Sequence, residues 1–183
     1  MTDNDFGDNY EIVWGDDQGS IERLTAEVRN YTLDGAQYRR IPVLRDDAKI
    51  RGYNMRFIVC DYDGDEPSII VSDEFLALPQ NMQSAAIWHE VGHVHHEHNF
   101  RFSQTDAHAH RRERIALIRD GRVQQLELEA DCFAVKMAGS AAIIAFLQRL
   151  LDTRPKGESG GVNDLGRIEL ELRIVEIKAI EQD

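Results

Sequence analysis

The sequence predicts an α+β fold: a small antiparallel or mixed sheet of about three strands, packed on a mostly helical domain with a central helix. Short runs of β-branched and aromatic residues, separated by turn residues, occur in the first half of the chain. Longer segments with helical spacing of apolar residues fill the second half. The segment 80–98 is apolar over more than half of its helical circumference, which is typical of a central, buried helix. This helix carries the sequence H-E-x-x-H at residues 89–93.

The composition excludes several classes of partner. The net charge of -12 at pH 7 disfavours binding to nucleic acids and to anionic membranes, because both need a basic protein surface. No apolar run approaches the length of a membrane span, and the first residues lack the pattern of a signal peptide. The two cysteines, Cys60 and Cys132, do not suggest a disulfide framework. We therefore expect a cytoplasmic protein with no nucleic-acid and no membrane partner.

Three segments of different composition are expected within the 183 residues. Residues 1–19 contain acidic but no basic residues, which indicates a solvated, flexible arm. The alternative is that this arm covers a positively charged metal cleft. Residues 20–154 would form the domain. Residues 155–183 would form a linker and a C-terminal helix that packs on the domain or on a partner, including a second copy in a homodimer.

The first elements of the domain are expected to be a helix and an irregular strand. Ser20 offers an N-cap, and the apolar residues at 21, 24, 28 and 31 have helical spacing, which predicts a helix over 20–32. Glu27 would face outward on this helix. Residues 39–44 contain Pro42, so they are expected to form an edge or irregular strand.

An antiparallel hairpin is expected next. Residues 53–62 and 68–72 are rich in β-branched and aromatic residues, and they flank the turn residues 63–65. The strand 68–72 is expected at the edge of the sheet, where an extended peptide substrate could add as a further strand. Pro79 would mark the entry to the next helix.

The second half of the chain is expected to be helical. Helices are predicted over 80–98, 122–137, 141–152 and from Asn163 or Asp164 to about 181. Residues 106–119 form a moderately helical, basic segment, interpreted as a solvated helix or, alternatively, a flexible lid. In the last helix, the apolar residues 165, 168, 172, 175 and 179 keep a 3–4 spacing, and those at 170, 174 and 177 widen the stripe.

The sequence His89-Glu90-Val91-Gly92-His93 predicts a metal site. Residues four apart on a helix share a face, so His89 and His93 present two imidazoles to one point. Two neutral imidazoles at this spacing fit a tetrahedral zinc ion, and Glu90 beside the metal can take a proton. A catalytic zinc needs a third protein ligand and leaves its fourth position to water.

The candidates for the third ligand are a downstream histidine or a carboxylate on another helix. Glu127 and Asp131 lie four residues apart and share a helical face. One of them can bind the metal while the other orients a ligand histidine. Glu129 is the rival ligand. Ala130 is small enough to let the two helices approach each other.

Five histidines accompany the two of the motif, and all seven lie between residues 89 and 110. The simplest interpretation of each of the five, which are His95, His96, His98, His108 and His110, is a surface or packing histidine. His98 is expected to lie closest to the site. Together with His108 and His110, it is a candidate for stabilising the oxyanion that develops during hydrolysis.

H-E-x-x-H followed by E-x-x-x-D on a second helix resembles the gluzincin zinc metallopeptidases. The stretch IIVSDEFLALPQNMQSAAIWHEVGHVHHEH is similar to the soluble core of the CAAX prenyl-protease-like family. The short chain without membrane spans also resembles the ImmA/IrrE-type peptidases and the minigluzincins. The resemblance covers about residues 67–137 and implies a zincin-like domain around the helix of the motif.

The resemblance also implies roles for individual residues. His89, His93 and Glu127 would bind Zn²⁺, Glu90 would act as the general base, and Asp131 would hold a ligand histidine. We therefore expect a zinc metalloendopeptidase of the gluzincin type, which hydrolyses a peptide or protein substrate through a zinc-activated water. The alternative is a catalytically silent or latent gluzincin-like module that binds metal and has a regulatory role.

Overall fold

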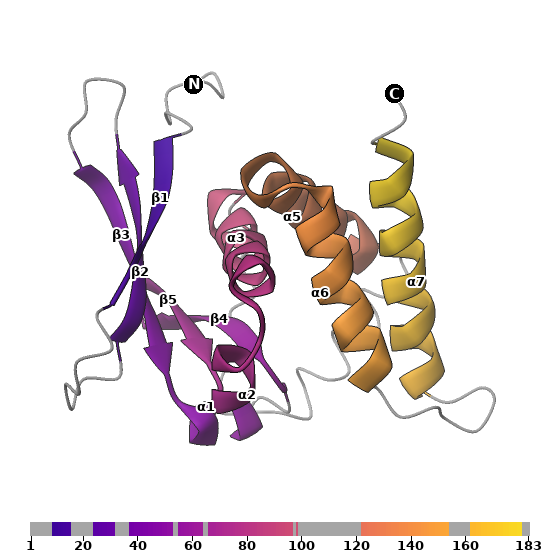
Figure 1. Cartoon of the computed structure of the whole chain (residues 1–183), viewed down its shortest axis with the longest axis horizontal. Coiled ribbons are helices and arrows are strands. Elements are labelled where there is room, and N and C mark those ends of the chain that lie inside the picture. Colours follow the sequence, from indigo (N-terminus) through magenta and orange to yellow (C-terminus); the bar gives the residue numbers. More distant parts are fainter. Residues whose placement is uncertain are drawn as a thin grey trace. The chain divides into compact units, whose positions relative to one another are not determined.

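The structure is a computed structural model of the chain. The residues that it describes are 9–15, 24–31, 37–52, 55–63, 66–96, 98, 122–153 and 162–180. Within them the chain forms five strands and six helices (Figure 1), which confirms the α+β class but not a sheet of about three strands. The chain divides into two compact units, residues 1–77 and 78–183. The predicted boundaries after residues 19 and 154 stay predictions.

The first unit contains a mixed sheet with the strand order β1-β2-β3-β5-β4. The strands are β1 Asn9–Trp14, β2 Leu24–Tyr31, β3 Gln37–Arg45, β4 Ile58–Asp63 and β5 Glu66–Val71. β3 and β5 are parallel, and the other neighbouring strands are antiparallel. Two short helices belong to the same unit, α1 Asp47–Gly52 and α2 Asp73–Leu76. Buried valine and isoleucine side chains of β2 to β5 form the core of this sheet, as their β-branched shape favours.

The predicted hairpin is confirmed, but the prediction that its second strand lies at the edge of the sheet is wrong. β4 and β5 are antiparallel, with Cys60 opposite Ile69. Residues 64 and 65 of the predicted turn lie outside the described part of the chain. β5 has β4 on one side and β3 on the other. It is buried at Ile69, Ile70 and Val71, on both of its faces, so a peptide cannot add to it as a further strand.

The predicted helix over 20–32 is wrong, because residues 24–31 form β2. Leu24 and Val28 have helical spacing, but the buried apolar side chains of Ala26 and Val28 lie two residues apart, which is the period of a strand. Glu27 was expected to face outward and is instead buried. Its carboxylate accepts a hydrogen bond of 2.6 Å from Arg29 Nε and also pairs with Arg40 across the sheet.

Two further expectations about strands are corrected. The acidic arm over residues 1–19 contains β1, which pairs with β2 in register. The segment that forms β1 contains two aromatic and two β-branched residues, which favour a strand despite the acidic composition of residues 1–19. β3 is not an edge strand, although it contains Pro42, because it lies between β2 and β5. Pairing with β5 begins only at Val43, so the residue without an N–H lies where one side of β3 has no strand partner among the described residues.

The second unit contains the predicted helices. They are α3 Gln80–His95, α5 Arg122–Ala138, α6 Ser140–Thr153 and α7 Val162–Ile180. α3 follows Pro79, as predicted, and ends at His95, whereas the predicted helix extended to residue 98. α5 ends at Ala138, and Gly139, directly after it, adopts the left-handed conformation with φ of +86°. The predicted basic segment over 106–119 lies outside the described residues.

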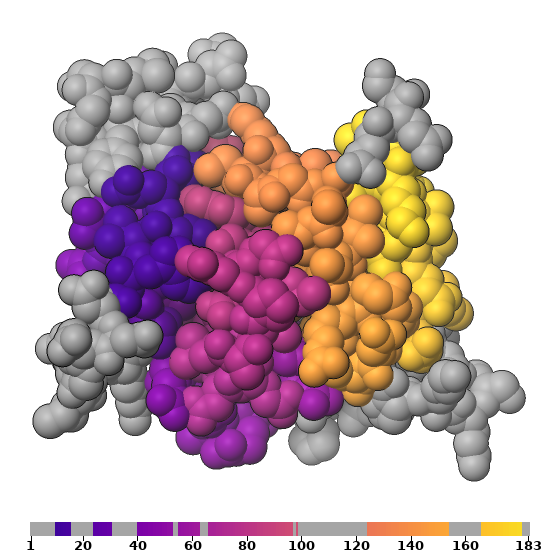
Figure 2. Space-filling model, in the orientation of Figure 1, coloured from indigo at the N-terminus to yellow at the C-terminus, as the bar shows by residue number. Residues whose placement is uncertain are grey.

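The last helix, α7, packs with its second apolar stripe, residues 170, 174 and 177, which was expected only to widen the first one. Among the residues 166–180 of α7, those that are buried are Leu170, Arg173, Ile174 and Ile177. α7 packs against α5 and α6, as predicted for a helix that packs on the domain. Of the first stripe, three large apolar side chains are instead exposed, by 50% at Ile168, 42% at Leu172 and 61% at Val175. α7 is the yellow helix in Figure 2. Pairing of this exposed stripe with a second copy of the chain stays a prediction.

None of the described helices combines the length and the apolar character that a membrane crossing requires. The expected cytoplasmic location stays a prediction.

α3 and α5 approach each other closely at Gly92 and Ala130. A Cβ atom placed on Gly92 would lie 2.8 Å from the Cα and 3.0 Å from the backbone oxygen of Ala130. The contact of 2.8 Å is shorter than real Cβ atoms show, and the contact of 3.0 Å is tighter than most of them. The atoms that the Cβ would meet in both contacts belong to the backbone. Glycine at 92 and the small side chain of Ala130 therefore allow the two helices to come together, as expected for Ala130.

We predict that Gly92→Ala destabilises the protein by about 1–3 kcal/mol through overpacking. The intrinsic preference of a helix for alanine over glycine, about 1 kcal/mol, acts in the opposite direction, so the sign of the change tests the close approach. Gly52→Ala is the matched control, because a Cβ atom on Gly52 meets nothing within 4 Å. Thermal unfolding measures both variants. A Gly92→Ala variant as stable as the wild type would contradict the prediction.

Candidate metal centre

Two imidazoles of α3 face the same point. His89 and His93 lie one helical turn apart. Their Nε2 atoms are 3.1 Å apart, and both side chains are buried. The two histidines lie within a run of helix that is buried from Ala85 to Val94 and that is largely apolar. The prediction of a central, buried helix for the motif is thereby confirmed.

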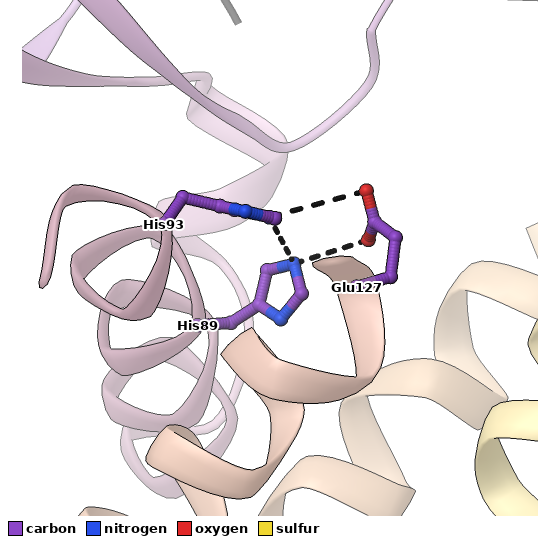
Figure 3. A group of neighbouring side chains, drawn as sticks. All are labelled: His89, His93 and Glu127. Carbon is purple, nitrogen blue, oxygen red and sulfur yellow. Dashed lines mark hydrogen bonds and ion pairs between the residues drawn. The ribbon is translucent and has the colours of Figure 1, made fainter. Parts of the chain in front are cut away.

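α5 adds a carboxylate to the two imidazoles. Glu127 Oε2 lies 3.3 Å from His89 Nε2, and Glu127 Oε1 lies 3.9 Å from His93 Nε2 (Figure 3). Two atoms that each bind a tetrahedral zinc at its usual distance are separated by about 3.3–3.6 Å. The three separations in the protein bracket this value. His89, His93 and Glu127 therefore form a group that could hold a metal ion.

Asp131 lies behind the first histidine, on the side away from this group. Its Oδ1 is 2.8 Å from His89 Nδ1. The proton of this contact belongs to the imidazole nitrogen, because the carboxylate only accepts. Asp131 thereby fixes the ring of His89 with Nε2 directed at Glu127 and His93. This is the arrangement by which an outer carboxylate orients a metal-binding histidine.

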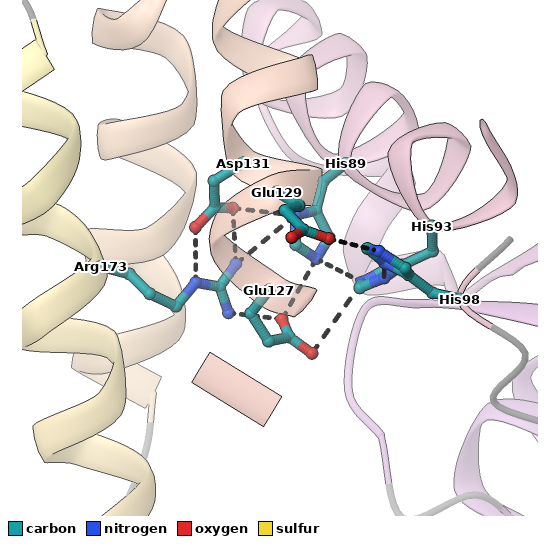
Figure 4. Close-up of polar contacts among 7 residues, drawn as sticks. All are labelled: His89, His93, His98, Glu127, Glu129, Asp131 and Arg173. Carbon is teal, nitrogen blue, oxygen red and sulfur yellow. Dashed lines mark hydrogen bonds and ion pairs between the residues drawn. The ribbon is translucent and has the colours of Figure 1, made fainter. Parts of the chain in front are cut away.

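Arg173 of α7 holds both carboxylates of α5, and the sequence analysis did not identify it. Its Nε and one terminal nitrogen donate to the two oxygens of Asp131, each at 2.6 Å. Its other terminal nitrogen donates to Glu127 Oε2 at 2.7 Å (Figure 4). The signal in the sequence was an arginine inside an apolar stripe, between Leu170 and Ile174 on the buried face. A fully buried arginine requires a charged partner.

The charges of this group are strongly coupled. Burial would raise the pKa of Glu127 and of Asp131, but Arg173 and His89 outweigh it and hold both pKa values below their ordinary range. Burial likewise opposes the charge on His89, yet Asp131 and Glu127 raise the pKa of this imidazole to about 10. Burial and the neighbouring charge of His89 lower the pKa of His93 to about 3. In the metal-free protein one proton is therefore held by His89, and a metal ion must displace it.

The other predicted residues lie at different places. Glu129 is turned toward His98, with its Oε2 2.9 Å from His98 Nε2, and is not part of the group that could hold a metal ion. His98 is buried next to the site, as expected, and its Nδ1 lies 3.0 Å from His93 Nδ1. Because both of its ring nitrogens have partners within the protein, His98 does not fit the role of oxyanion donor. His108 and His110 lie outside the described residues.

Comparisons of the chain with protein-family models, with curated proteins and with solved structures give no significant match. The resemblance to gluzincin peptidases stays a prediction from the two motifs of the sequence.

We predict that Glu127→Ala abolishes stoichiometric zinc binding, because two imidazoles alone do not complete a catalytic zinc site. Glu129→Ala is the matched control on the same helix, and it should still bind one zinc per chain at saturation. Elemental analysis after reconstitution and gel filtration measures both. Loss of the metal in Glu129→Ala and its retention in Glu127→Ala would reverse the assignment of the third ligand.

We also predict that Arg173→Met destabilises the metal-free protein by about 3–5 kcal/mol, because it leaves two buried carboxylates without their cation. Arg173→Lys should lose less, since it keeps the charge but not the fork of donors. Arg149 on α6 is exposed, and Arg149→Met should stay within about 0.5 kcal/mol of the wild type. Denaturant unfolding compares the three variants. Equal losses for Arg173→Met and Arg149→Met would show that the buried ion pairs contribute nothing.

Proposed function

We propose that the protein is a zinc-dependent metallopeptidase of the gluzincin type. The observation that carries this proposal is the convergence of His89 Nε2, His93 Nε2 and the Glu127 carboxylate at separations that suit a tetrahedral ion. Glu90, the glutamate of the motif, neighbours His89 on the same buried helix. A metal-binding group of this composition next to a glutamate is the arrangement required for hydrolysis by an activated water.

The donor set supports zinc as the metal. Two imidazole nitrogens and one carboxylate are borderline donors that suit zinc, whereas calcium and magnesium prefer sites built from oxygen alone. Three protein ligands leave one position for water, as in catalytic rather than structural zinc sites. When bound, zinc would supply a Lewis acid and a water molecule whose pKa is lowered toward about 7.

The other residues of the site would orient the ligands and transfer the proton. Asp131 and Arg173 keep the His89 ring in place, and Arg173 also holds the Glu127 carboxylate. Glu90 would take the proton of the water and pass it to the amine of the leaving group. Glu90 is only 8% exposed, and burial keeps bulk water from competing for that proton. The substrate would be a peptide or protein.

One observation favours a second candidate function, a latent or regulatory module that binds metal without hydrolysis. Arg173 already pairs with Glu127 at 2.7 Å, so the third ligand has a cation before any metal is present. Arg173 thus competes with a metal for the Glu127 carboxylate, which favours a site that binds and releases metal without hydrolysis. Cleavage of a mixed peptide library by the full chain with one zinc bound separates the two candidates, since only the peptidase produces new amino termini.

We predict that Glu90→Gln keeps one zinc per chain and loses peptide hydrolysis by about 10²–10⁴-fold, because the amide cannot accept the proton of the water. Metal content and the rate of peptide cleavage are measured on the same preparation. Glu74→Gln is a control at an exposed glutamate of α2, and it should cleave at the rate of the wild type. Full hydrolysis by the zinc-loaded Glu90→Gln variant would exclude Glu90 as the base.

A further inference from the structure

We propose that His98 and Glu129 form a second orienting pair, which fixes His93 for metal binding as Asp131 and Arg173 fix His89. This inference rests on the metal site of the proposed function but not on its peptidase activity. It gives a role to a histidine beyond the motif and to the glutamate that was the rival metal ligand.

The contacts run in one line away from the metal group. His93 Nε2 faces His89 and Glu127, while His93 Nδ1 lies 3.0 Å from His98 Nδ1. His98 Nε2 then lies 2.9 Å from Glu129 Oε2 (Figure 4). Each imidazole therefore uses one nitrogen toward the site and the other away from it.

Only one arrangement of protons satisfies all of these contacts when a metal is bound. His93 Nε2 must offer its lone pair to the metal, so its proton lies on Nδ1. His98 Nδ1 must then accept that proton in a hydrogen bond, and the proton of His98 lies on Nε2. This N–H donates to Glu129, whose carboxylate can only accept. The negative charge of Glu129 thus selects the tautomer of His98, and through it the tautomer of His93.

The pair is held in place by both helices. The backbone N–H of His98 donates to the carbonyl of His93 at 2.9 Å, which anchors His98 beyond the last turn of α3. Gln125 Nε2 donates to Glu129 Oε1 at 3.1 Å on α5, and this fixes the other oxygen of the carboxylate. His98 itself is buried, whereas the side chain of Glu129 is 40% exposed. The orienting carboxylate thus faces solvent, and its replacement creates no cavity in the core.

The two orienting pairs differ in a way that sets their expected strength. Asp131 is fully buried and contacts His89 directly. Glu129 acts on His93 only through His98, across one more hydrogen bond and closer to solvent. We therefore expect His98 and Glu129 to tune the affinity of the site for metal, and Asp131 to be needed for the site to form at all.

The test measures the dissociation constant for zinc by competition with a chromophoric chelator, on the full chain. His98→Ala and Glu129→Ala should each weaken zinc binding by about 10–100-fold, the range for outer partners of a ligand, with one zinc per chain still bound at saturation. Glu129→Gln should recover most of the loss, because its amide oxygen can still accept from His98 Nε2. In the double variant, Glu129→Ala should add nothing to His98→Ala, because Glu129 acts through His98.

His96→Ala is the matched control, because His96 is exposed and its ring stacks on His98 at a centroid distance of 5.4 Å. It removes a neighbouring imidazole but not the line of contacts, so zinc affinity should stay at the wild-type value. Absorption spectra of the cobalt-substituted variants report the coordination number, so a spectrum like that of the wild type shows that the weaker binding comes neither from a lost ligand nor from a disrupted fold.

Three results would overturn the inference. Wild-type affinity in both single variants would show that the pair does not act on His93. Additive losses in the double variant would show that Glu129 acts by another route. Loss of stoichiometric metal in Glu129→Ala would make Glu129 a ligand. Absence of peptide cleavage by a zinc-loaded wild type would instead overturn the proposed function alone, because affinity is measured without a substrate.

Discussion

The candidate site depends on the ion pairs that Arg173 makes with Asp131 and Glu127. Taking carboxylates out of water costs several kcal/mol each unless a cation and hydrogen bonds compensate. Asp131 is fully buried, and the guanidinium of Arg173 meets both of its oxygens. The same guanidinium reaches Glu127. α7 is therefore part of the site, although the motifs that identify it lie on α3 and α5. α7 contributes no ligand to the candidate metal group, but its Arg173 supplies the positive charge that allows the carboxylates of Asp131 and Glu127 to be buried.

The second constraint is the distance between α3 and α5. Side chains of His89, His93 and Glu127 can meet at ligand separations only if the two helices lie close together. Gly92 and Ala130 make this approach possible, because neither has a side chain that would keep the backbones apart. Glycine inside a helix costs about 1 kcal/mol of intrinsic stability relative to alanine. The motif therefore gives up helical propensity at one position to bring its ligands within reach of the second helix.

The helices of the second unit were predictable to within about a turn, because long segments with a period of 3.6 residues are the strongest local signal. The same period placed Glu127 and Asp131 on one helix face, whereas their separate roles were implied only by the resemblance to gluzincin peptidases. β2 was mistaken for a helix because Leu24 and Val28 happen to lie four residues apart. Which side chains are buried distinguishes a strand from a helix here, and burial is known only from the fold. Arg173 lies 46 residues from Glu127, and no local pattern joins them. Contacts of this kind depend on how helices pack, which the order of residues along one helix does not state.

If a divalent metal binds to His89, His93 and Glu127 as proposed, the charges around them would favour an anionic fourth ligand. Without metal, the negative charges of Glu127 and Asp131 are balanced by Arg173 and by the proton that the high pKa of His89 retains. His89 Nε2 lies 3.1 Å from His93 Nε2, so this proton can occupy the space between the ligands. Exchange of one proton for a divalent ion leaves these groups with a single excess positive charge. In a buried environment such an excess is unfavourable, and a hydroxide or a developing oxyanion would neutralise it. The cation that stabilises the carboxylates thus also sets the charge that a reacting oxygen would meet.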